Sequence, residues 1–351
     1  MRTIQFISTA IAVIILTSCG NYYRMVTTLD ENGNAIRDVY AEGDSAFMAG
    51  NRSNNPYLFD IDSSWKVTRF DSTIKHNFFG NEKHLNVQIT KHVASIDLFK
   101  KEIAHGHYKG SMAIPEESLV KRFRWFYTNY TFTGVFKRLE YTVPIPIDQY
   151  LTKEEQKLWT QGYAGKYGMM NGSEMNDLLS GIEEKFMNWY SHNCLEISLT
   201  CIENLTSEQI AETDKEAIYK QLNELEADIT PKRVSAALDE HYKTTRFTEL
   251  YKANREKLDQ EFENSTAIVN QLSNTISYEL TVPGEIVSTN SPIYDSNNLV
   301  WKVDGIRILF DDYTLTAEYR VVNLWAFIVS GLTLLTAIIS MILLWKRRNA
   351  A

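Results

Sequence analysis

The chain has 351 residues, of which 44% are hydrophobic and 23% charged, with only 7 prolines and 16 glycines. These proportions exclude an intrinsically disordered chain and predict a folded region of about 300 residues, enough for one large domain or two smaller ones. The formal net charge of −8 argues against a nucleic acid as the partner.

The charges are unevenly distributed along the chain. From Ser72 to Glu140 the sequence holds 11 Lys and Arg against 6 Asp and Glu, and from Glu203 to Glu263 it holds 9 against 15. A basic region suits an anionic membrane or glycan surface, and it also suits the solvated face of an ordinary domain.

Residues 1–18 have the features of a lipoprotein signal peptide. Arg2 and the free amine form a short basic region, an apolar run follows from Phe6 to Leu16, and two small residues precede Cys19. By resemblance to bacterial lipoproteins, cleavage would leave Cys19 as the first residue, acylated with palmitate or a similar chain. The alternative is an uncleaved apolar anchor with an incidental cysteine.

Residues 19–148 are predicted to be rich in strands. Arg24–Leu29 and Ala35–Tyr40 flank the sequence DENGN, which is a strong hairpin signal, and Leu85–Ile89 alternates apolar and polar residues. The run Phe123–Thr133 is dense in aromatic and β-branched residues, so we expect one strand there. At least half of its aromatic side chains should be in the core, although Trp and Tyr also suit carbohydrate or lipid contact. They are Trp125, Phe126, Tyr127, Tyr130 and Phe132.

Residues 149–275 are predicted to form a helical insertion. Thr152 with Glu155 and Thr213 with Glu216 fit the capping box, and Thr230 precedes a proline in the first helical position. No glycine occurs between Gly181 and Gly284. Helices should therefore dominate for about a hundred residues.

Two further expectations concern this helical region. Thr245–Asn274 should form one helix about 45 Å long, with an apolar stripe that packs on the protein's own sheet or forms an exposed partner-binding surface. The stripe consists of Tyr251, Leu258, Phe262, Val269, Leu272 and Ile276. Cys194 and Cys201 lie seven residues apart in a predicted helix, which separates their Cα atoms by about 10 Å, so we expect two buried thiols and no disulfide.

Residues 276–322 return to strands separated by turns. The predicted strands are Ser277–Val282, Glu285–Thr289, Leu299–Val303 and Tyr313–Val321. Four short strands are too few for a core, so we expect them to join the N-terminal strands in one mixed antiparallel sheet. The predicted fold class is therefore α+β, a single domain with a helical insertion and a C-terminal membrane helix.

Residues 323–345 form a predicted transmembrane helix. Its 22 uncharged residues from Leu324 to Trp345 span about 33 Å, enough to cross a hydrocarbon core of about 30 Å. Trp325 and Trp345 lie at its two ends as interfacial anchors. The basic cluster beside this helix lies only on its C-terminal side, in the short tail 346–351, and consists of Lys346, Arg347 and Arg348.

The positive-inside rule places that tail in the cytoplasm and the folded region outside, in the periplasm if the membrane is a bacterial inner membrane. Small residues recur along one face of the helix, at Ala326, Ser330, Thr333, Ala337 and Ser340. Such a face allows helix-mediated self-association.

One segment resembles a known family. Val282–Asn290 (VPGEIVSTN) and Leu299–Val303 (LVWKV) are similar to a hairpin of LppM-type bacterial lipoproteins, which are also lipidated chains with an extracytoplasmic α+β domain and a C-terminal membrane helix. The resemblance implies binding of lipid or lipoglycan at the cell envelope, and it transfers no residue as a ligand contact. The residues themselves suggest a structural hairpin with Trp301 in the core.

The sequence offers little catalytic chemistry. It contains no G-x-S-x-G, H-E-x-x-H, Walker or C-x-x-C motif. His105 and His107, with Glu102 nearby, lack a further ligand at a diagnostic spacing for a metal. We therefore predict no catalytic, cofactor-binding or metal-binding residue.

Three hypotheses for function follow. The first is a non-catalytic, membrane-tethered envelope lipoprotein that binds a partner, for instance another membrane protein, or organises the envelope. The second is a binder of an envelope lipid or glycolipid, which needs a cavity for its ligand. The third is a hydrolase with a dispersed site. In each, the bilayer itself is a partner.

Overall fold

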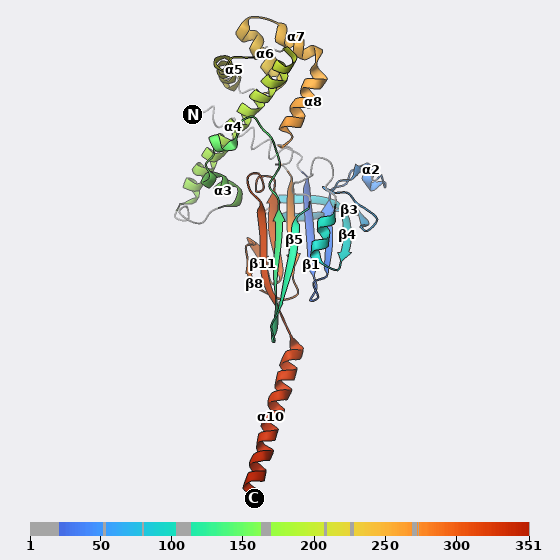
Figure 1. Cartoon of the computed structure of the whole chain (residues 1–351). Coiled ribbons are helices and arrows are strands. Elements are labelled where there is room, and N and C mark those ends of the chain that lie inside the picture. Colours follow the sequence, from blue (N-terminus) through green and yellow to red (C-terminus); the bar gives the residue numbers. More distant parts are fainter. Residues whose placement is uncertain are drawn as a thin grey trace. The chain divides into compact units, whose positions relative to one another are not determined.

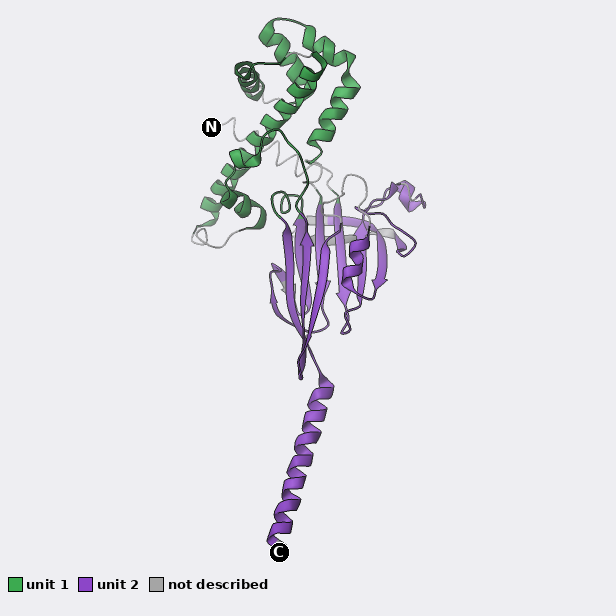
Figure 2. Ribbon diagram, viewed as in Figure 1, with its two compact units in different colours: residues 1–21, 138–274, 304–311 green, residues 22–137, 275–303, 312–351 purple. Residues whose placement is uncertain are grey.

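The computed structural model describes residues 21–51, 54–78, 81–102, 114–162, 170–206, 209–224, 228–268, 272 and 274–350. The chain divides into two compact units, which Figure 2 colours separately. Unit 1 contains residues 138–274 and 304–311 together with the N-terminal segment up to Asn21. Unit 2 contains residues 22–137, 275–303 and 312–351.

Unit 2 contains a seven-stranded sheet in the order β3-β4-β2-β1-β7-β10-β9 (Figure 1). β1 pairs with β7 in parallel and with β2 in an antiparallel hairpin. The strands are β1 (Tyr22–Leu29), β2 (Ala35–Ala41), β3 (Lys66–Phe78), β4 (Asn81–Val93), β7 (Thr275–Thr281), β9 (Ile293–Asp295) and β10 (Asn298–Asp304). The helix α2 (Ser45–Met48) lies between β2 and β3, and the 3-10 helix η2 (Ile96–Lys101) follows β4.

The β1–β2 turn forms as its sequence predicts. The Asp30 carboxylate accepts hydrogen bonds from the backbone N–H groups of Asn32 at 2.8 Å and Asn34 at 2.9 Å. Gly33 adopts a φ of 94°, which a residue without a Cβ reaches at little cost. The hairpin expected on either side of DENGN is therefore confirmed.

A second, four-stranded sheet in unit 2 has the order β5-β6-β11-β8, and its neighbouring strands are all antiparallel. The strands are β5 (Glu116–Phe123), β6 (Tyr127–Phe136), β8 (Glu285–Thr289) and β11 (Tyr313–Val322). The two sheets face each other through aromatic rings. The Phe132 ring centroid lies 6.2 Å from that of Tyr278 and 6.5 Å from that of Trp301.

The α+β class and the combination of N-terminal and C-terminal strands are confirmed, since both sheets contain strands from both regions. The strands nevertheless form two facing sheets where the sequence predicted one. Two facing sheets bury their apolar faces against each other, whereas one sheet of so many strands would leave an apolar face to be covered.

The expected single strand Phe123–Thr133 is wrong. β5 ends at Phe123 and β6 begins at Tyr127, and the Arg124 N–H donates to the Tyr127 carbonyl oxygen at 2.8 Å across the turn. Of the five aromatic residues expected mostly in the core, Tyr130 and Phe132 are buried, Tyr127 is half-buried, and Trp125 and Phe126 are exposed. The turn lacks the Gly, Pro, Asn or Asp residues that mark most turns.

The segment Val282–Val303, which carries the family resemblance, is not a hairpin. Glu285–Thr289 pairs with β11 in one sheet, while Leu299–Val303 belongs to β10 in the other. Trp301 is fully buried as expected, and its indole N–H donates to Asn290 Oδ1 at 2.9 Å. Packing explains why residue 284 is a glycine, because a Cβ there would clash with the Arg320 carbonyl oxygen.

Unit 1 is helical. Its elements are η4 (Ile147–Gln149), α3 (Lys153–Gln161), α4 (Gly172–Thr206), α5 (Glu212–Glu224), α6 (Pro231–Tyr242), α7 (Arg246–Ala253) and α8 (Arg255–Thr266). The main core is largely aliphatic and includes Leu199, Ile202, Ile218, Val234 and Leu238, each 0% exposed. A smaller cluster joins Ile197 and Cys201 of α4 to Tyr251 and Leu258.

Two of the three predicted helix starts are confirmed. Thr152 and Glu155 form a reciprocal capping box at α3, and Thr230 caps α6 with proline in the first position. The predicted cap at Thr213 is wrong, because α5 already begins at Glu212 and Thr213 lies within its first turn.

The expected helix Thr245–Asn274 is broken. α7 ends and α8 begins at Asn254, whose φ of −125° and ψ of 22° leave the helical range. Tyr251 of α7 and Leu258 of α8 both pack against α4, and Ile276 lies in β7. Val269 lies outside the described residues. Cys194 and Cys201 are free and buried, as expected from their spacing in one helix.

Candidate functional site

α10 (Leu324–Ala350) is the described helix that could cross a membrane, since Leu324–Asn349 is long and apolar enough to do so. Trp325 lies in its first turn and Trp345 near its end, both exposed at 49% and 63%, and Lys346–Arg348 continue the helix beyond them. The structure thus places these predicted anchor residues on one helix. Cys19 lies outside the described residues.

The junction between β11 and α10 consists of one residue, Asn323. Its backbone N–H donates to the Phe126 carbonyl oxygen at 2.9 Å. Its side-chain Nδ2 donates to the carbonyl oxygens of Arg124 at 2.7 Å and Trp125 at 3.2 Å, and its Oδ1 accepts from the Thr128 hydroxyl at 2.9 Å. Asn323 therefore attaches the start of α10 to the β5–β6 turn.

Aromatic rings surround this junction and are here called the aromatic collar: Phe123, Trp125, Phe126, Tyr127, Trp325 and Phe327. Phe123 stacks on Trp325 with centroids 6.2 Å apart and planes within 6°. Phe126 lies 4.7 Å from Phe327, and Trp125 lies edge-on to Trp325 at 5.2 Å. Because such offset and edge contacts add to the burial of apolar area, the collar stiffens the link between sheet and helix.

The collar covers part of the small-residue face of α10. Ala326 is 0% exposed, and the Ser330 hydroxyl accepts a hydrogen bond from the Trp125 indole N–H at 2.8 Å. The first two positions of that face therefore serve contacts within the chain. Thr333, Ala337 and Ser340 are exposed and remain available to a partner helix.

Basic side chains lie beside the collar. Lys121, Arg122 and Arg124 are exposed, and residues 120–129 contain no acidic residue. Arg320 on β11 is paired with Glu285 at 2.8 Å and lies over the Tyr127 ring at 5.1 Å. The turn thus combines exposed rings with a net positive charge.

A buried ion pair connects the two sheets of unit 2. Arg37 of β2 donates to both Glu117 carboxylate oxygens of β5, at 2.6 and 2.7 Å, and to the Thr27 hydroxyl at 3.0 Å. Burial has the largest single effect on the pKa of Arg37 and lowers it, but the charges and hydrogen bonds of Glu117 and Tyr278 together outweigh burial and raise that pKa. Burial raises the pKa of Tyr278, which also donates to Glu117, far above its usual value. The raised pKa values keep Arg37 charged and Tyr278 neutral, which suits a structural link better than acid–base catalysis.

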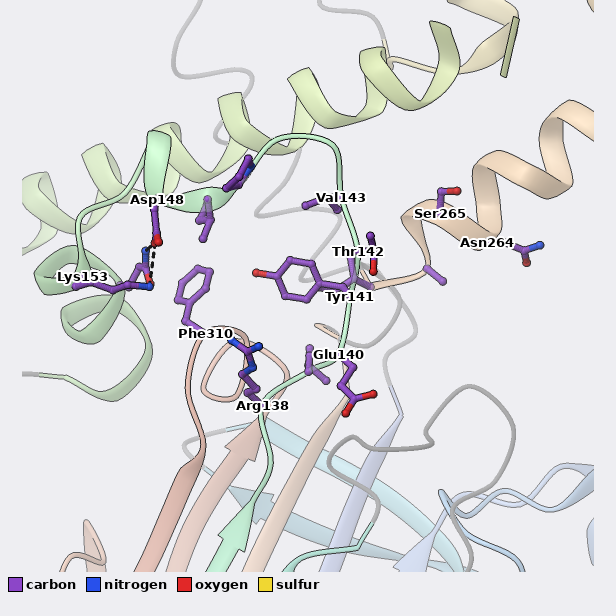
Figure 3. Close-up of a pocket in the computed structure, with 16 residues that line it drawn as sticks. Arg138, Glu140, Tyr141, Thr142, Val143, Asp148, Lys153, Asn264, Ser265 and Phe310 are labelled. Atoms are coloured by element: carbon purple, nitrogen blue, oxygen red, sulfur yellow. Dashed lines mark hydrogen bonds and ion pairs between the residues drawn. The ribbon is translucent and has the colours of Figure 1, made fainter. Parts of the chain in front are cut away.

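Unit 1 contains an open cavity of about 880 Å³ (Figure 3). Its lining includes the rings of Tyr141 and Phe310 and the charged groups of Arg138, Asp148 and Lys153. Asp148 accepts from Lys153 Nζ at 2.9 Å and from Gln156 at 2.8 Å, and the Lys153 bond holds the pKa of Asp148 below its usual range. Rings beside hydrogen-bonding groups suit a polar ligand such as a sugar.

The described residues hold no group of three or more His, Cys, Asp and Glu side chains that could bind a metal. His105 and His107 lie outside them. One acid–histidine contact occurs on the surface of unit 1, where His241 Nε2 lies 3.2 Å from Asp214 and the Tyr242 hydroxyl donates to the same carboxylate at 2.6 Å. That bond raises the pKa of Tyr242 to about 12, so its hydroxyl stays protonated near neutral pH.

Sequence reasoning predicted Trp325 as an anchor but missed Asn323 and its partner Arg124. It also missed the contact of Phe123 with Trp325 and that of Trp125 with Ser330. An Asn directly before a long apolar run was a usable signal, because Asn often caps a helix start. The pairing of that residue with a turn about two hundred positions earlier had no local signal.

Comparison with known protein families and with curated proteins finds no match. Among solved structures, the chain is similar to the NMR structure of the LppM folded domain from Mycobacterium tuberculosis. The identity is 8%, the alignment covers 86% of this chain and 91% of that chain, and the TM-score is 0.29. This TM-score is too low to establish a shared fold.

Proposed function

We propose that this chain is a membrane-tethered, non-catalytic lipoprotein of the bacterial cell envelope that binds or organises other envelope components. The observation that carries the proposal is the Asn323 junction, where β11 ends at Val322 and α10 begins at Leu324. A folded unit joined to a membrane helix through one hydrogen-bonded residue is held in a defined orientation at the bilayer. Such a construction suits the presentation of a binding surface.

The proposed topology has a lipid on Cys19, one membrane crossing through α10, and the folded units outside the cytoplasm. The basic residues Lys346–Arg348 lie only at the C-terminal end of α10, which supports a cytoplasmic tail. The inner membrane is the proposed location, because a helix of this length and composition matches its hydrocarbon thickness.

The non-catalytic role is supported by the hydrogen bonding and the burial of the ionisable groups in the interior. Glu117, Arg37 and Tyr278 satisfy one another between the sheets, and Cys194 is a buried thiol whose pKa burial raises to about 11. A nucleophile or general base needs the opposite, a group whose pKa lies near the working pH and that reaches a cleft.

The tether is tested with the Cys19→Ala variant of the full chain. We expect this variant to stay in the membrane pellet after washing with alkaline carbonate, because α10 alone retains it. A second variant that combines Cys19→Ala with a stop codon after Asn323 should become soluble. Release of the single variant Cys19→Ala by carbonate would show that α10 does not cross the membrane.

The cavity in unit 1 favours a second candidate, the binding of an envelope lipid or glycolipid. Its volume of about 880 Å³ falls in the usual range for ligand sites, and its rings and charges suit the polar part of such a ligand. Native mass spectrometry of the chain purified in mild detergent tests it. A bound glycolipid that is lost in Tyr141→Ala but kept in Tyr242→Ala, whose ring does not line the cavity, would support this candidate.

The same purification tests the partner-binding role. A protein that co-purifies at a fixed ratio supports the first proposal. If that partner is a membrane protein or a second copy bound through α10, Ala337→Leu should weaken the association, because a bulky side chain there blocks close helix approach.

A further inference from the structure

The β5–β6 turn of unit 2 exposes several large apolar side chains. Residues 120–127 are called the hairpin tip from here on. Val120, Phe123, Trp125 and Phe126 are 48%, 56%, 47% and 40% exposed. Apolar side chains gathered in this way mark a contact with a partner or a membrane.

The hydrogen bond to α10 sets the depth of the hairpin tip. The Trp125 indole N–H reaches Ser330, which lies six residues after Leu324 and therefore about 9 Å further along the helix axis. Leu324–Trp345 spans about 33 Å, which matches the hydrocarbon core of about 30 Å. When α10 crosses a bilayer from Leu324, the Trp125 ring must therefore lie inside that bilayer and not above it.

The backbone of the tip is suited to this position. A carbonyl group inside a bilayer needs a hydrogen bond from within the protein, since water does not supply one there. The carbonyl oxygens of Arg124, Trp125 and Phe126 all accept hydrogen bonds from Asn323. The most apolar part of the turn thus has its backbone acceptors satisfied by the residue that begins the membrane helix.

The charges of the tip indicate which lipids it contacts. Arg122 pairs in register with Asn129, and Asn129 pairs in register with Arg320 on the other side, so the cross-strand neighbours of Arg122 are neutral or basic. Arg320 is already neutralised by Glu285. Arg122 and Arg124 are exposed, and long basic side chains near a membrane interface extend toward the headgroups.

We infer that the hairpin tip inserts into the outer interface of the bilayer that α10 crosses, where Trp125 and Phe126 enter the boundary of the hydrocarbon and Arg122 and Arg124 bind the phosphates of anionic lipid headgroups. The inference rests on the proposed function, because it takes α10 as a membrane helix. The collar rings are continuous with the surface of α10, and this favours the bilayer over a protein partner as the occupant.

Spin labels on single cysteines test the insertion. The full chain is reconstituted into vesicles, and labels at Phe126→Cys, Ile293→Cys and Leu334→Cys are compared for collisions with oxygen and with a water-soluble nickel reagent. Ile293 is a matched control, because it is 41% exposed on β9. Burial raises the pKa values of Cys194 and Cys201, so these thiols should label poorly, and the unsubstituted chain gives the background.

We expect the label at residue 126 to collide with the nickel reagent several-fold less often than the label at 293, and that at 334 to be the most shielded. A label at 126 that is as accessible as that at 293, with 334 shielded, would overturn the inference and leave the tether intact. Accessible labels at both 126 and 334 would refute the tether as well. The same labels are also measured in lipid-free detergent. If the label at 126 is shielded from the nickel reagent there only when another protein co-purifies, the tip binds a protein partner and the inference is overturned.

A second measurement avoids a new cysteine. Tryptophan fluorescence quenching by lipids brominated in the acyl chain should fall in Trp125→Phe, which keeps an apolar ring at the tip. The intensity lost to quenching should be unchanged in Trp65→Phe, since Trp65 is buried among Phe59 and Phe99 and is not reached by the quencher. Equal quenching in Trp125→Phe and the wild type would contradict insertion.

Lipid selectivity tests the charged part of the inference. Spin-labelled lipids measure how strongly the lipid shell around the protein prefers phosphatidylglycerol over phosphatidylcholine. This preference should fall about fivefold in Arg122→Gln and about fivefold in Arg124→Gln. The double variant Lys66→Gln with Lys100→Gln removes two positive charges from exposed sites elsewhere in unit 2, as many as the two arginine substitutions together, and should keep the preference. An unchanged preference in both arginine variants would overturn the assignment to anionic headgroups.

Discussion

The two units use different kinds of core. Unit 1 is built around aliphatic side chains on helices that follow one another in the sequence, such as Leu199, Ile218 and Leu238. Unit 2 is built around aromatic rings and the buried ion pair Arg37–Glu117, whose two residues lie 80 positions apart in the sequence. Stability in unit 1 therefore depends on packing volume and helix ends, whereas stability in unit 2 depends also on charges that must be satisfied across the sheets.

Breaking the charge pair should have the largest effect. In Glu117→Gln, Arg37 stays buried without its counter-charge, so we expect a loss of about 3–5 kcal/mol in the free energy of unfolding of unit 2. Denaturant titration of the full chain in mild detergent, followed by tryptophan fluorescence, measures it.

The adjacent Glu116 is the matched control. It is 65% exposed and bonded to Lys137 at 3.3 Å, so Glu116→Gln should cost less than about 1 kcal/mol. Equal stabilities for the two variants would show that the Arg37–Glu117 pair contributes no more than a surface contact.

A cavity in the helical core should have the next largest effect. Leu238→Ala removes a fully buried side chain from unit 1, and we expect a loss of about 2–5 kcal/mol. Helical circular dichroism during denaturation reports this unit. Met170→Ala, at a position 39% exposed, should stay within about 0.5 kcal/mol of the wild type. A small change in Leu238→Ala would mean that the core of unit 1 relaxes around the cavity.

Removal of a helix cap should have a smaller effect. The Thr230 hydroxyl accepts from the Arg233 N–H at 3.4 Å, and Thr230→Ala should cost about 1 kcal/mol in the stability of unit 1. Thr213→Ala is the control, because Thr213 lies inside α5 and caps nothing. If Thr213→Ala costs as much as Thr230→Ala, the observed start of α5 is wrong.

The smallest effect at neutral pH concerns Cys194, whose thiol is protonated in both folded and unfolded chains. Burial raises its pKa from 9.0 to about 11. The neutral thiol is the favoured form in the fold, so its contribution to stability is fully present below pH 9 and is lost as the pH rises toward 11.

Alkylation at pH 8 checks this, because the thiolate fraction of the folded chain should be about a hundredfold below that of the urea-unfolded chain. Apart from Cys19, the cysteines of the chain are Cys194 and Cys201, and both lie in α4 of unit 1. Alkylation therefore reports on unit 1 and not on the sheets. Alkylation of folded Cys194 as fast as in urea would contradict the burial.

The difference between the units also explains which predictions succeeded. The caps at Thr152 and Thr230 and the thiols of α4 were predictable, because each depends on residues within one or two helical turns. The break at Asn254 was missed, since residues 245–274 contain no glycine or proline and their apolar spacing continues across the break. In unit 2, the β1–β2 hairpin was predictable from its turn, while the division into two sheets was not.

The candidate site shows the same limit. The apolar helix α10 was predictable from hydropathy alone, and the anchor roles of its tryptophans and basic residues stay predictions. The β5–β6 turn was not, because aromatic residues without glycine or proline look like a continuous strand. The role of Asn323 depends on partners about two hundred residues away.

The sequence by itself determined the α+β class, the presence of an apolar C-terminal helix, the helical character of the insertion and the free state of its two thiols. These follow from local periodicity, composition and spacing. Only the tertiary structure decided that the strands form two sheets, that Arg37 and Glu117 meet between them, and that Asn323 joins the hairpin tip to α10. Each of these depends on which distant segments come together, and that choice is made by the free energy of the whole packed unit and not by any one segment.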